Sequence, residues 1–188
     1  MRRVLAFYKF TPVADPADHA EELQRMGEQL GVVGTILLAE EGVNGTIVAE
    51  MASLDAMVRT LETVFGAMTF KWSDLDQSGV GFHRFKVRIK PEIVSFGVAG
   101  LDLQQTGEHV DGTRWNELLD DPDVLVIDTR NQYEIDIGTF DNAVSPETGN
   151  FREFPQWVQD NIDPAKQRKV AMFCTGGIRC EKASALVA

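Results

Sequence analysis

The sequence is poor in cysteine and histidine, with two cysteines and three histidines among 188 residues. Two cysteines cannot build the disulfide framework of small secreted domains, so we expect a reducing, cytoplasmic setting. The histidines are scattered and form no cluster with the cysteines, so the sequence predicts no metal site. No apolar run approaches the length that spans a bilayer, and the N-terminal residues lack the long apolar stretch of a signal peptide. We therefore expect a soluble protein with no membrane partner.

Positive charge is also scarce, since 18 Lys and Arg residues stand against 29 Asp and Glu residues, a net charge of −11. Such an acidic chain is unsuited to broad binding of nucleic acid, and no DNA partner is expected. The imbalance is uneven: residues 1–100 carry ten basic and thirteen acidic side chains, whereas residues 101–188 carry eight and sixteen. Any RNA-binding surface is therefore expected in the first half or bridging the two halves.

Residues 1–95 have the pattern of a small domain with a packed core. Strands are predicted where apolar residues alternate or run together, and helices where they recur every three or four residues. The predicted order is strand, helix, two strands joined by a turn, helix and strand, which is the order of a ferredoxin-like α+β sandwich. The strands are predicted at 4–10, 32–39, 46–49 and 82–90, and the helices at 16–30 and 53–65. Asn44-Gly45 predicts that the hairpin turns within 40–45, and Ser53 is expected to cap the second helix.

The last predicted strand of this domain concentrates positive charge. Four cations alternate with three apolar residues, so a period of two places all four on one face of the strand. One interpretation is a surface that contacts RNA phosphates. The alternative is an ordinary solvated face whose cations pair with the many carboxylates. The four cations, which we call the cationic stripe, are Arg84, Lys86, Arg88 and Lys90.

The second domain is predicted over residues 109–188, after a linker at 96–108 that is rich in glycine, glutamine and threonine and follows a short strand at 93–96. Asp111 is a plausible cap for a helix that buries Trp115. Residues 124–128 form a nearly continuous apolar run, as expected of a strand buried on both faces of a parallel sheet. Further elements are predicted at 143–144 (strand), 151–160 (helix) and 170–173 (strand).

Asp128 and Arg130 follow the central strand of this domain at its carboxyl end. Functional loops of open α/β sheets gather at that edge. We favour a structural role for both residues, because the Asp128 carboxylate can cap the following turn and Arg130 can pair with an acid. The alternative is that Arg130 reaches the functional pocket.

The clearest chemical signal follows the strand at 170–173. Cys174 stands at the end of this strand, Gly176 and Gly177 permit unusual backbone angles, and Arg179 precedes a helical segment. A loop that enters a helix N-terminus points backbone N–H groups inward, and the helix dipole adds positive potential there. A thiol in this setting ionises readily, and the thiolate is its reactive form. The coincidence of these residues favours a catalytic cysteine over a buried structural one.

The spacing of this loop narrows its chemistry. Arg179 comes five positions after Cys174, one residue short of the loop with which cysteine phosphatases encircle a phosphate. The smaller loop suits a single sulfur or oxygen atom carried on the thiol, and it resembles the active loop of rhodanese domains, where the cysteine carries a persulfide. Cys180 falls at the start of the helix, beyond the loop. We expect it to be dispensable or auxiliary, for example by resolving an oxidised Cys174 as a disulfide.

A longer match identifies a subfamily. Residues 172–183 read MFCTGGIRCEKA, which resembles the bacterial oxygen-dependent tRNA wobble-uridine hydroxylases. Those proteins place a small α/β domain before a rhodanese domain, so the resemblance extends over essentially the whole chain. Rhodanese domains also carry an Asp-x-Arg and a Tyr-Glu pair, here Asp128 with Arg130 and Tyr133 with Glu134. The resemblance implies an acylphosphatase-like domain, then a rhodanese-like parallel-sheet domain that is incomplete here, because rhodanese domains continue with a further strand and helix.

The resemblance also implies an oxidoreductase that hydroxylates the wobble uridine of tRNA to 5-hydroxyuridine. Dioxygen would be the co-substrate, the reductant is unidentified, and the sequence shows no cofactor. Cys174 would be the nucleophile, Arg179 with the two glycines would hold the charged intermediate, and the anticodon region of tRNA would be the partner. This activity is expected of the full-length protein. One alternative is a sulfurtransferase that carries a persulfide from thiosulfate or a sulfur-donor protein on Cys174. Another is a non-catalytic module that binds RNA or protein.

Overall fold

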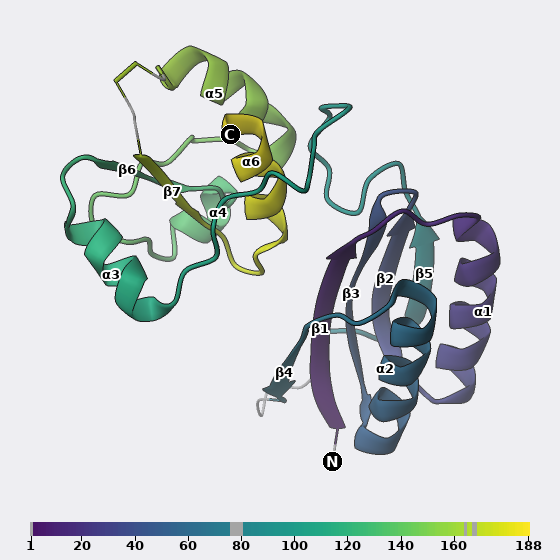
Figure 1. Cartoon of the computed structure of the whole chain (residues 1–188). Helices are drawn as coiled ribbons and strands as arrows, with labels where there is room; N and C mark the ends of the chain where they lie inside the picture. The colour runs from purple at the N-terminus through teal and green to yellow at the C-terminus, as the bar shows by residue number, and fades with distance from the viewer. Residues whose placement is uncertain (1, 76–80, 164, 167–168) are drawn as a thin grey trace. The chain divides into compact units, whose positions relative to one another are not determined.

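The computed structural model of the chain describes residues 2–75, 81–163, 165–166 and 169–188 (Figure 1). The chain divides into two compact units, Met1–Ile93 and Val94–Ala188, and each has its own hydrophobic core. The segment 96–108, expected as a linker, therefore lies within the second unit, where Phe96 is only 1% exposed and packs against Phe151 and Phe154. The short strand expected at 93–96 does not form. No helix in the described ranges combines the length and the apolarity needed to cross a bilayer.

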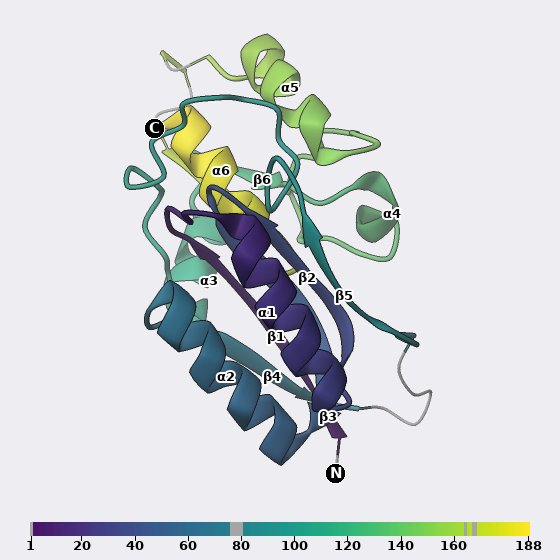
Figure 2. The ribbon, with the colours of Figure 1, turned by 90° about the vertical axis from the view of Figure 1, so that its right-hand side faces the viewer.

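The first unit is a five-stranded sheet with two helices on one of its faces (Figures 1 and 2). The strand order is β4-β1-β3-β2-β5, in which β5 runs parallel to β2 and the other neighbours are antiparallel. This confirms the predicted ferredoxin-like sandwich. The strands are β1 (Arg2–Phe10), β2 (Val33–Ala39), β3 (Gly42–Glu50), β4 (Phe70–Asp74) and β5 (Phe85–Ile89), and the helices are α1 (Pro16–Gln29) and α2 (Met51–Phe65).

The prediction of one strand after α2 was wrong, because two are present. The expected strand at 82–90 is β5, which extends the sheet beside β2 at one edge. The place beside β1 at the opposite edge belongs to β4, which was not predicted. Only Phe70 and Trp72 of this short strand pack on the core, so its alternation is too brief to be distinctive.

The hairpin between β2 and β3 turns at residues 40–41, because Ala39 pairs with Gly42. The turn therefore falls within the predicted range 40–45, but not at Asn44-Gly45, because both residues lie inside β3. The backbone of Gly42 has φ 147°, and a Cβ atom there would lie 2.0 Å from the carbonyl oxygen of Lys9. Asn44 instead donates from Nδ2 to the carbonyl oxygen of Ile93 at 2.9 Å, so its amide serves a tertiary contact rather than a turn.

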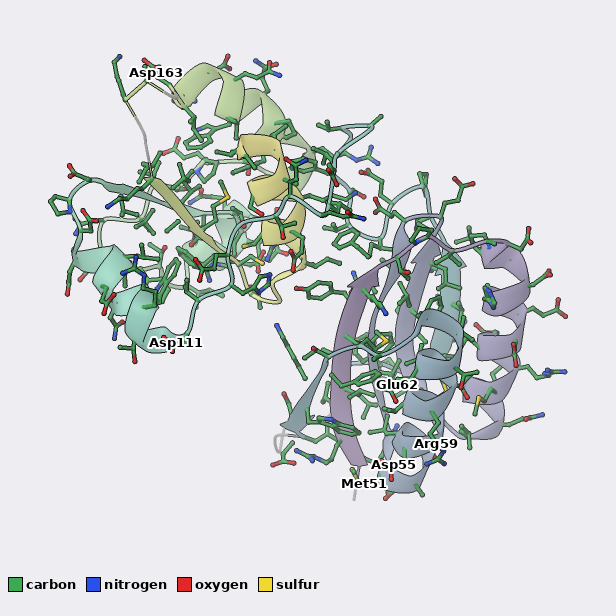
Figure 3. The ribbon with its side chains drawn as sticks, in the orientation of Figure 1. Met51, Asp55, Arg59, Glu62, Asp111 and Asp163 are labelled. Carbon is green, nitrogen blue, oxygen red and sulfur yellow. The ribbon has the colours of Figure 1, made fainter. Side chains whose placement is uncertain are left out.

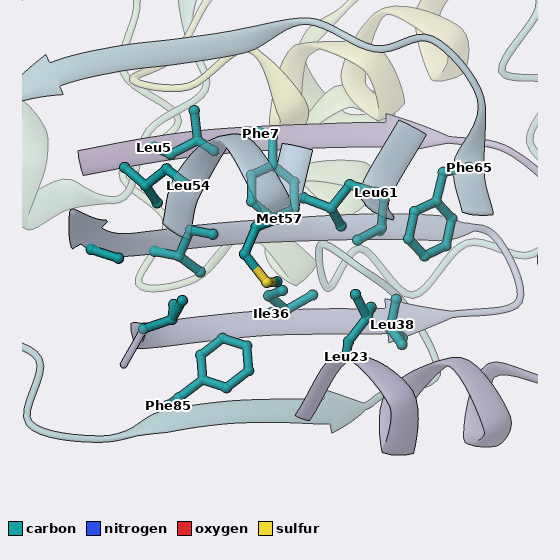
Figure 4. Close-up of a cluster of buried hydrophobic side chains, with 14 of the residues drawn as sticks. Leu5, Phe7, Leu23, Ile36, Leu38, Leu54, Met57, Leu61, Phe65 and Phe85 are labelled. Atoms are coloured by element: carbon teal, nitrogen blue, oxygen red, sulfur yellow. The ribbon is translucent and has the colours of Figure 1, made fainter. Parts of the chain in front are cut away.

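The core of the first unit lies between the sheet and its helices. Phe7 of β1, Ile36 of β2 and Leu61 of α2 point into it (Figure 4), and each is at most 3% exposed. The opposite face of α2 carries Asp55, Arg59 and Glu62, which are exposed and point away from the sheet (Figure 3). Ser53 does not cap α2 as expected, because its hydroxyl donates to the carbonyl oxygen of Leu30 at 2.9 Å and so joins the two helices.

Helix α1 fixes the position of β5. Gly27 lies so close to this strand that a Cβ atom there would be 2.1 Å from the ring of Phe85. The Gln24 side chain accepts a hydrogen bond from the backbone N–H of Val87 at 2.8 Å and donates one to the carbonyl oxygen of Phe85 at 3.3 Å. One amide thus occupies part of the outer edge of β5, as a further strand would, and this protects the edge from non-native pairing.

The second unit is built on two parallel strands, β6 (Val124–Asp128) and β7 (Lys169–Phe173). Their pairing confirms the predicted parallel sheet, whereas the strand expected at 143–144 is only an isolated bridge from Val144 to Ile127. Asp111 caps the first helix as predicted, because its carboxylate accepts a hydrogen bond from the N–H of Arg114 at 2.8 Å (Figure 3). The helices are α3 (Gly112–Asp120), α4 (Gln132–Ile135), a 3-10 helix (Phe151–Glu153), α5 (Phe154–Asn161) and α6 (Ile178–Val187).

Candidate active site around Cys174

The candidate site begins where β6 and β7 end side by side. Asp128, the last residue of β6, pairs with Phe173, the last of β7, so Thr129 and Cys174 leave the sheet together. The N–H and the hydroxyl of Thr129 both donate to the carbonyl oxygen of Phe173 at 3.0 Å. These two bonds fix the residue before Cys174 against the neighbouring strand, at the edge where open α/β sheets carry their sites.

A short loop carries the chain from Cys174 into α6 (Figure 1). The N–H of Gly177 donates to the Cys174 sulfur at 3.0 Å, and the N–H groups of Arg179 and Cys180 also point to that sulfur. Gly177 has φ 91°, a conformation that side chains disfavour, so glycine is required there. The same need does not hold at Gly176, where a Cβ atom would meet nothing within 4 Å. The loop is therefore an anion-binding cradle that depends on one glycine.

Cys180 lies nearer to the loop than its spacing in the sequence predicted, because its sulfur is 3.6 Å from the hydroxyl of Thr129, which donates to the carbonyl oxygen of Phe173. The interaction with the Cys180 thiol and the backbone N–H groups outweigh the effect of burial and lower the pKa of Cys174 to about 5. The same interaction, together with burial and the charge of the thiolate, raises the pKa of Cys180. These opposite shifts favour one thiolate and one thiol at the site near neutral pH.

Arg179 is held beside the cradle by Glu134 of α4. Its Nη1 and Nη2 donate to the two carboxylate oxygens of Glu134 at 2.6 and 2.8 Å, and the hydroxyl of Thr175 donates to the same carboxylate at 2.6 Å. The bond from Arg179 lowers the pKa of Glu134 to about 2. Burial alone would lower the pKa of Arg179, but Glu134 and the Cys174 thiolate outweigh it and raise that pKa. The guanidinium therefore stays charged and is shared between a carboxylate and a thiolate.

Asp128 and Arg130 bind each other at the end of β6. Asp128 is fully buried and accepts hydrogen bonds from Nε and Nη2 of Arg130 at 2.9 and 2.6 Å, and from the hydroxyl of Thr139 at 2.8 Å. It also accepts from the backbone N–H of Arg130 at 3.1 Å, which caps the turn. The Arg130 guanidinium lies over the ring of Phe173, 5.5 Å from its centroid. This geometry holds the loop after β6 in place.

A pocket of about 560 Å³ opens beside the loop. Gly176, Ile178 and Arg179 form the side that belongs to the loop and to the start of α6, and Asn131, Asn150 and Arg152 supply polar groups elsewhere. This volume lies in the usual range for small-molecule sites. The combination of two guanidinium groups with two amides suits a polar, anionic ligand with hydrogen-bonding edges.

The cationic stripe lies in the first unit. Its four side chains are exposed, whereas Phe85 between them is buried in the core. In β5, Lys86 lies opposite Thr35 and Arg88 opposite Leu37 of β2, on the face of the sheet that α1 and α2 leave uncovered. Within the part of the chain that the structure describes, none of the four forms an ion pair. That weakens the alternative in which the stripe is balanced by neighbouring carboxylates.

Comparison with known proteins finds similarity along most of the chain. Residues 2–93 match the family model described as the UPF0176 acylphosphatase-like domain. A tRNA uridine(34) hydroxylase from a Synechocystis species is 50% identical over 184 residues, which is 97% of this chain. The chain spans 66% of the length of that protein, just under two thirds.

Solved structures also match part of the chain. An acylphosphatase from Coxiella burnetii is 14% identical with a TM-score of 0.34, over 46% of this chain and 90% of that one. An acylphosphatase from Bacillus subtilis is 13% identical with a TM-score of 0.35, over 46% of this chain and 98% of that one.

Three residues that touch or belong to the loop were missed as site residues. Glu134 was noted only within a Tyr-Glu pair, although it binds Arg179 from 45 positions away. Thr129 and Thr175 carried no signal at all, because a threonine beside a strand end is common. The acid at position 134 could have been found by asking which carboxylate neutralises Arg179. In the described ranges, no group of three or more His, Cys, Asp or Glu is placed to hold a metal ion.

Proposed function

We propose that this chain carries the active centre of an enzyme that hydroxylates the wobble uridine of tRNA at C5, with dioxygen as co-substrate. One observation carries the proposal: the Cys174 sulfur lies in a cradle of N–H groups that lowers its pKa, in a chain that is half identical to a protein named as a tRNA uridine(34) hydroxylase. Such a thiolate is a strong nucleophile toward carbon, sulfur and peroxide oxygen. A tRNA substrate and a reduced pair of cysteines both fit the cytoplasm.

The number of electrons that dioxygen takes up shows that the reaction needs a reductant. Hydroxylation places one oxygen atom of dioxygen on C5 and reduces the other to water. Dioxygen takes up four electrons, of which the C5–H bond supplies two, so a reductant must supply the other two. The role of Cys174 is to react with the oxygen-bearing base, and the role of Arg179 is to stabilise the anion that forms beside it.

The pocket beside the loop is the proposed place for the uridine. Its volume of about 560 Å³ suits one nucleoside that has been turned out of the stacked anticodon loop. The amides of Asn131 and Asn150 can pair with the polar edge of uracil, and Arg152 can pair with a phosphate. Arg179 lies at the boundary between the pocket and the cradle, so a base bound there would face the cysteine loop.

The test is nucleoside mass spectrometry of tRNA from a bacterial strain that lacks its own wobble-uridine hydroxylases and expresses this chain. We expect 5-hydroxyuridine to reappear with the wild-type chain and not with the Cys174→Ser variant. The Synechocystis relative serves as the positive control, because this chain spans only part of its length. Absence of 5-hydroxyuridine from a folded, well-expressed wild-type chain, with a functioning control, would count against the proposal.

A sulfurtransferase is the second candidate, favoured by the fit of the cradle to one extra atom on Cys174. The N–H of Gly177 and its neighbours could hold a terminal sulfur as well as an oxygen anion. This enzyme would consume thiosulfate or accept sulfur from a donor protein. The same mass spectrometry separates the candidates, because a sulfurtransferase would change the level of thiolated uridine and leave 5-hydroxyuridine absent.

We further infer that the cationic stripe contacts the phosphates of tRNA. The double substitution Arg84→Ala/Arg88→Ala is expected to weaken the binding of all tRNAs alike, because phosphate contacts carry no base information. Each lost contact should flatten the plot of log affinity against log salt by about one unit. A salt titration of tRNA binding measures both effects.

The matched control is Arg25→Ala/Arg59→Ala, which removes the same charge from the helices of the same unit. If both double variants change the affinity and the slope equally, only the net charge matters and the stripe is not a contact surface. Folding should survive in the stripe variant, since the apolar face of β5 is untouched.

A further inference from the structure

The site holds a second sulfur that the proposed function leaves unused. Cys180 lies in the first turn of α6, three residues after Gly177, whose N–H donates to the Cys174 sulfur at 3.0 Å. The hydroxyl of Thr129 lies 3.6 Å from the Cys180 sulfur and is itself bound to the end of β7. The strand end on one side and the helix on the other therefore place both sulfurs at the same loop.

We propose that Cys180 is the resolving thiol of Cys174, and that the disulfide they form supplies the two electrons that each hydroxylation consumes. The use of these electrons rests on the proposed function. The formation of the disulfide rests on the placement of both sulfurs at this loop. Cys180 would then be part of the catalytic cycle rather than an auxiliary residue.

The steps balance as follows. Dioxygen adds at C5 of uridine, the C5–H bond breaks and its hydrogen passes to the outer oxygen, which gives a C5 hydroperoxide. The Cys174 sulfur takes the terminal oxygen, so the O–O bond breaks, C5 keeps a hydroxyl group and Cys174 becomes a sulfenic acid. The Cys180 thiolate then attacks the Cys174 sulfur, so that the S–S bond forms, the S–O bond breaks and hydroxide leaves as water after protonation. In sum, uridine, dioxygen and two thiols give 5-hydroxyuridine, water and one disulfide, which an external protein dithiol reduces.

The charges around Cys174 and Cys180 determine the order of these steps. While Cys174 is a thiolate, its hydrogen bond and its charge raise the pKa of Cys180, which stays a thiol. Conversion of Cys174 to a neutral sulfenic acid removes that negative charge. The Thr129 hydroxyl and the Arg179 guanidinium remain, and both favour the Cys180 thiolate. Cys180 therefore becomes nucleophilic only after Cys174 has been oxidised.

The same pair argues against persulfide transfer. A persulfide on Cys174 would also be open to attack by Cys180, and this attack would release hydrosulfide and discard the sulfur before it reached an acceptor. A sulfur carrier gains nothing from a thiol beside its loaded cysteine. A hydroxylase, in contrast, needs two electrons per turnover, and the two thiols supply them.

The first test needs neither tRNA nor dioxygen. The reduced chain is treated anaerobically with an equimolar amount of hydrogen peroxide and digested with trypsin, which cleaves after Arg179 and separates Cys174 in peptide 170–179 from Cys180 in peptide 180–182. We expect the two peptides to be joined by a disulfide. The Cys180→Ser variant should instead stop at a sulfenic acid on Cys174, which dimedone labels. Peptides that stay unlinked in the wild-type chain would overturn the proposal and leave the proposed hydroxylase standing.

The second test is turnover with tRNA, dioxygen and a dithiol reductant. Cys180→Ser is expected to lose repeated turnover while it still binds tRNA. Because the variant also removes a hydrogen bond that keeps Cys174 ionised, the assay is repeated at a pH where alkylation shows Cys174 fully ionised. A loss that persists there supports the resolving role. Turnover at the wild-type rate in Cys180→Ser overturns it, even where the wild-type enzyme proves to be a hydroxylase.

Discussion

Replacement of Cys174 by serine is expected to abolish 5-hydroxyuridine, with a fall in rate of more than about 10³-fold. Serine fits the space of the thiol, and the strand, the cradle and α6 are unchanged. Its hydroxyl stays protonated near neutral pH, however, so the N–H groups that stabilise the Cys174 thiolate have no anion to bind. The measurement is the yield of the modified nucleoside under single-turnover conditions, where reduction of the disulfide does not limit the rate.

Two further measurements distinguish a loss of chemistry from unfolding or from a loss of tRNA binding. The thermal midpoint of Cys174→Ser should stay near that of the wild type, because no packing is lost. Binding of tRNA should also persist, because the cationic stripe lies in the other unit. A Cys174→Ser variant that still forms the product at the wild-type rate would remove Cys174 from the mechanism, and with it the proposed role of Cys180.

The loop around Cys174 could be predicted because all of its parts are local. A strand end, a glycine at a positive φ and a helix start follow one another within a few residues, and each has a recognisable residue preference. The ferredoxin-like fold could be predicted for a similar reason, since α1, α2 and most strands show clear periodicity.

The parts that escaped prediction depend on contacts between distant residues. Glu134 has the context of a polar residue in a short helix, and only the pairing of β6 with β7 brings it to Arg179. Asn44 has the strongest local turn signal in the chain, yet its amide is used to bind the Ile93 carbonyl, so a tertiary contact overrides the local preference. Sequence spacing put Cys180 beyond the cradle, because spacing alone does not show that the first turn of α6 points this side chain back to Cys174.

Substitution of Arg179 by alanine is expected to raise the pKa of Cys174 by about one to two units. Two effects act in the same direction: a positive charge beside the thiolate is lost, and the carboxylate of Glu134 is left without its partner. The pKa of Cys174 should nevertheless stay below that of a free cysteine, because the Cys180 thiol and the loop N–H groups remain. The rate of iodoacetamide alkylation as a function of pH measures the shift, since only the thiolate reacts. Arg179→Lys should rescue the shift only in part, because lysine lacks the planar fork that binds Glu134.

The double variant Arg179→Ala/Glu134→Gln separates the two effects. Glutamine keeps the size of Glu134 and can still accept a hydrogen bond from Thr175, but it places no negative charge beside the thiolate. The midpoint of alkylation should therefore lie between those of Arg179→Ala and the wild type. If Glu134 only holds the loop in shape, the double variant should instead match or exceed the shift of Arg179→Ala. An alkylation profile that is unchanged in Arg179→Ala itself would show that the cradle ionises Cys174 without the guanidinium, and Arg179 would then act only on the substrate.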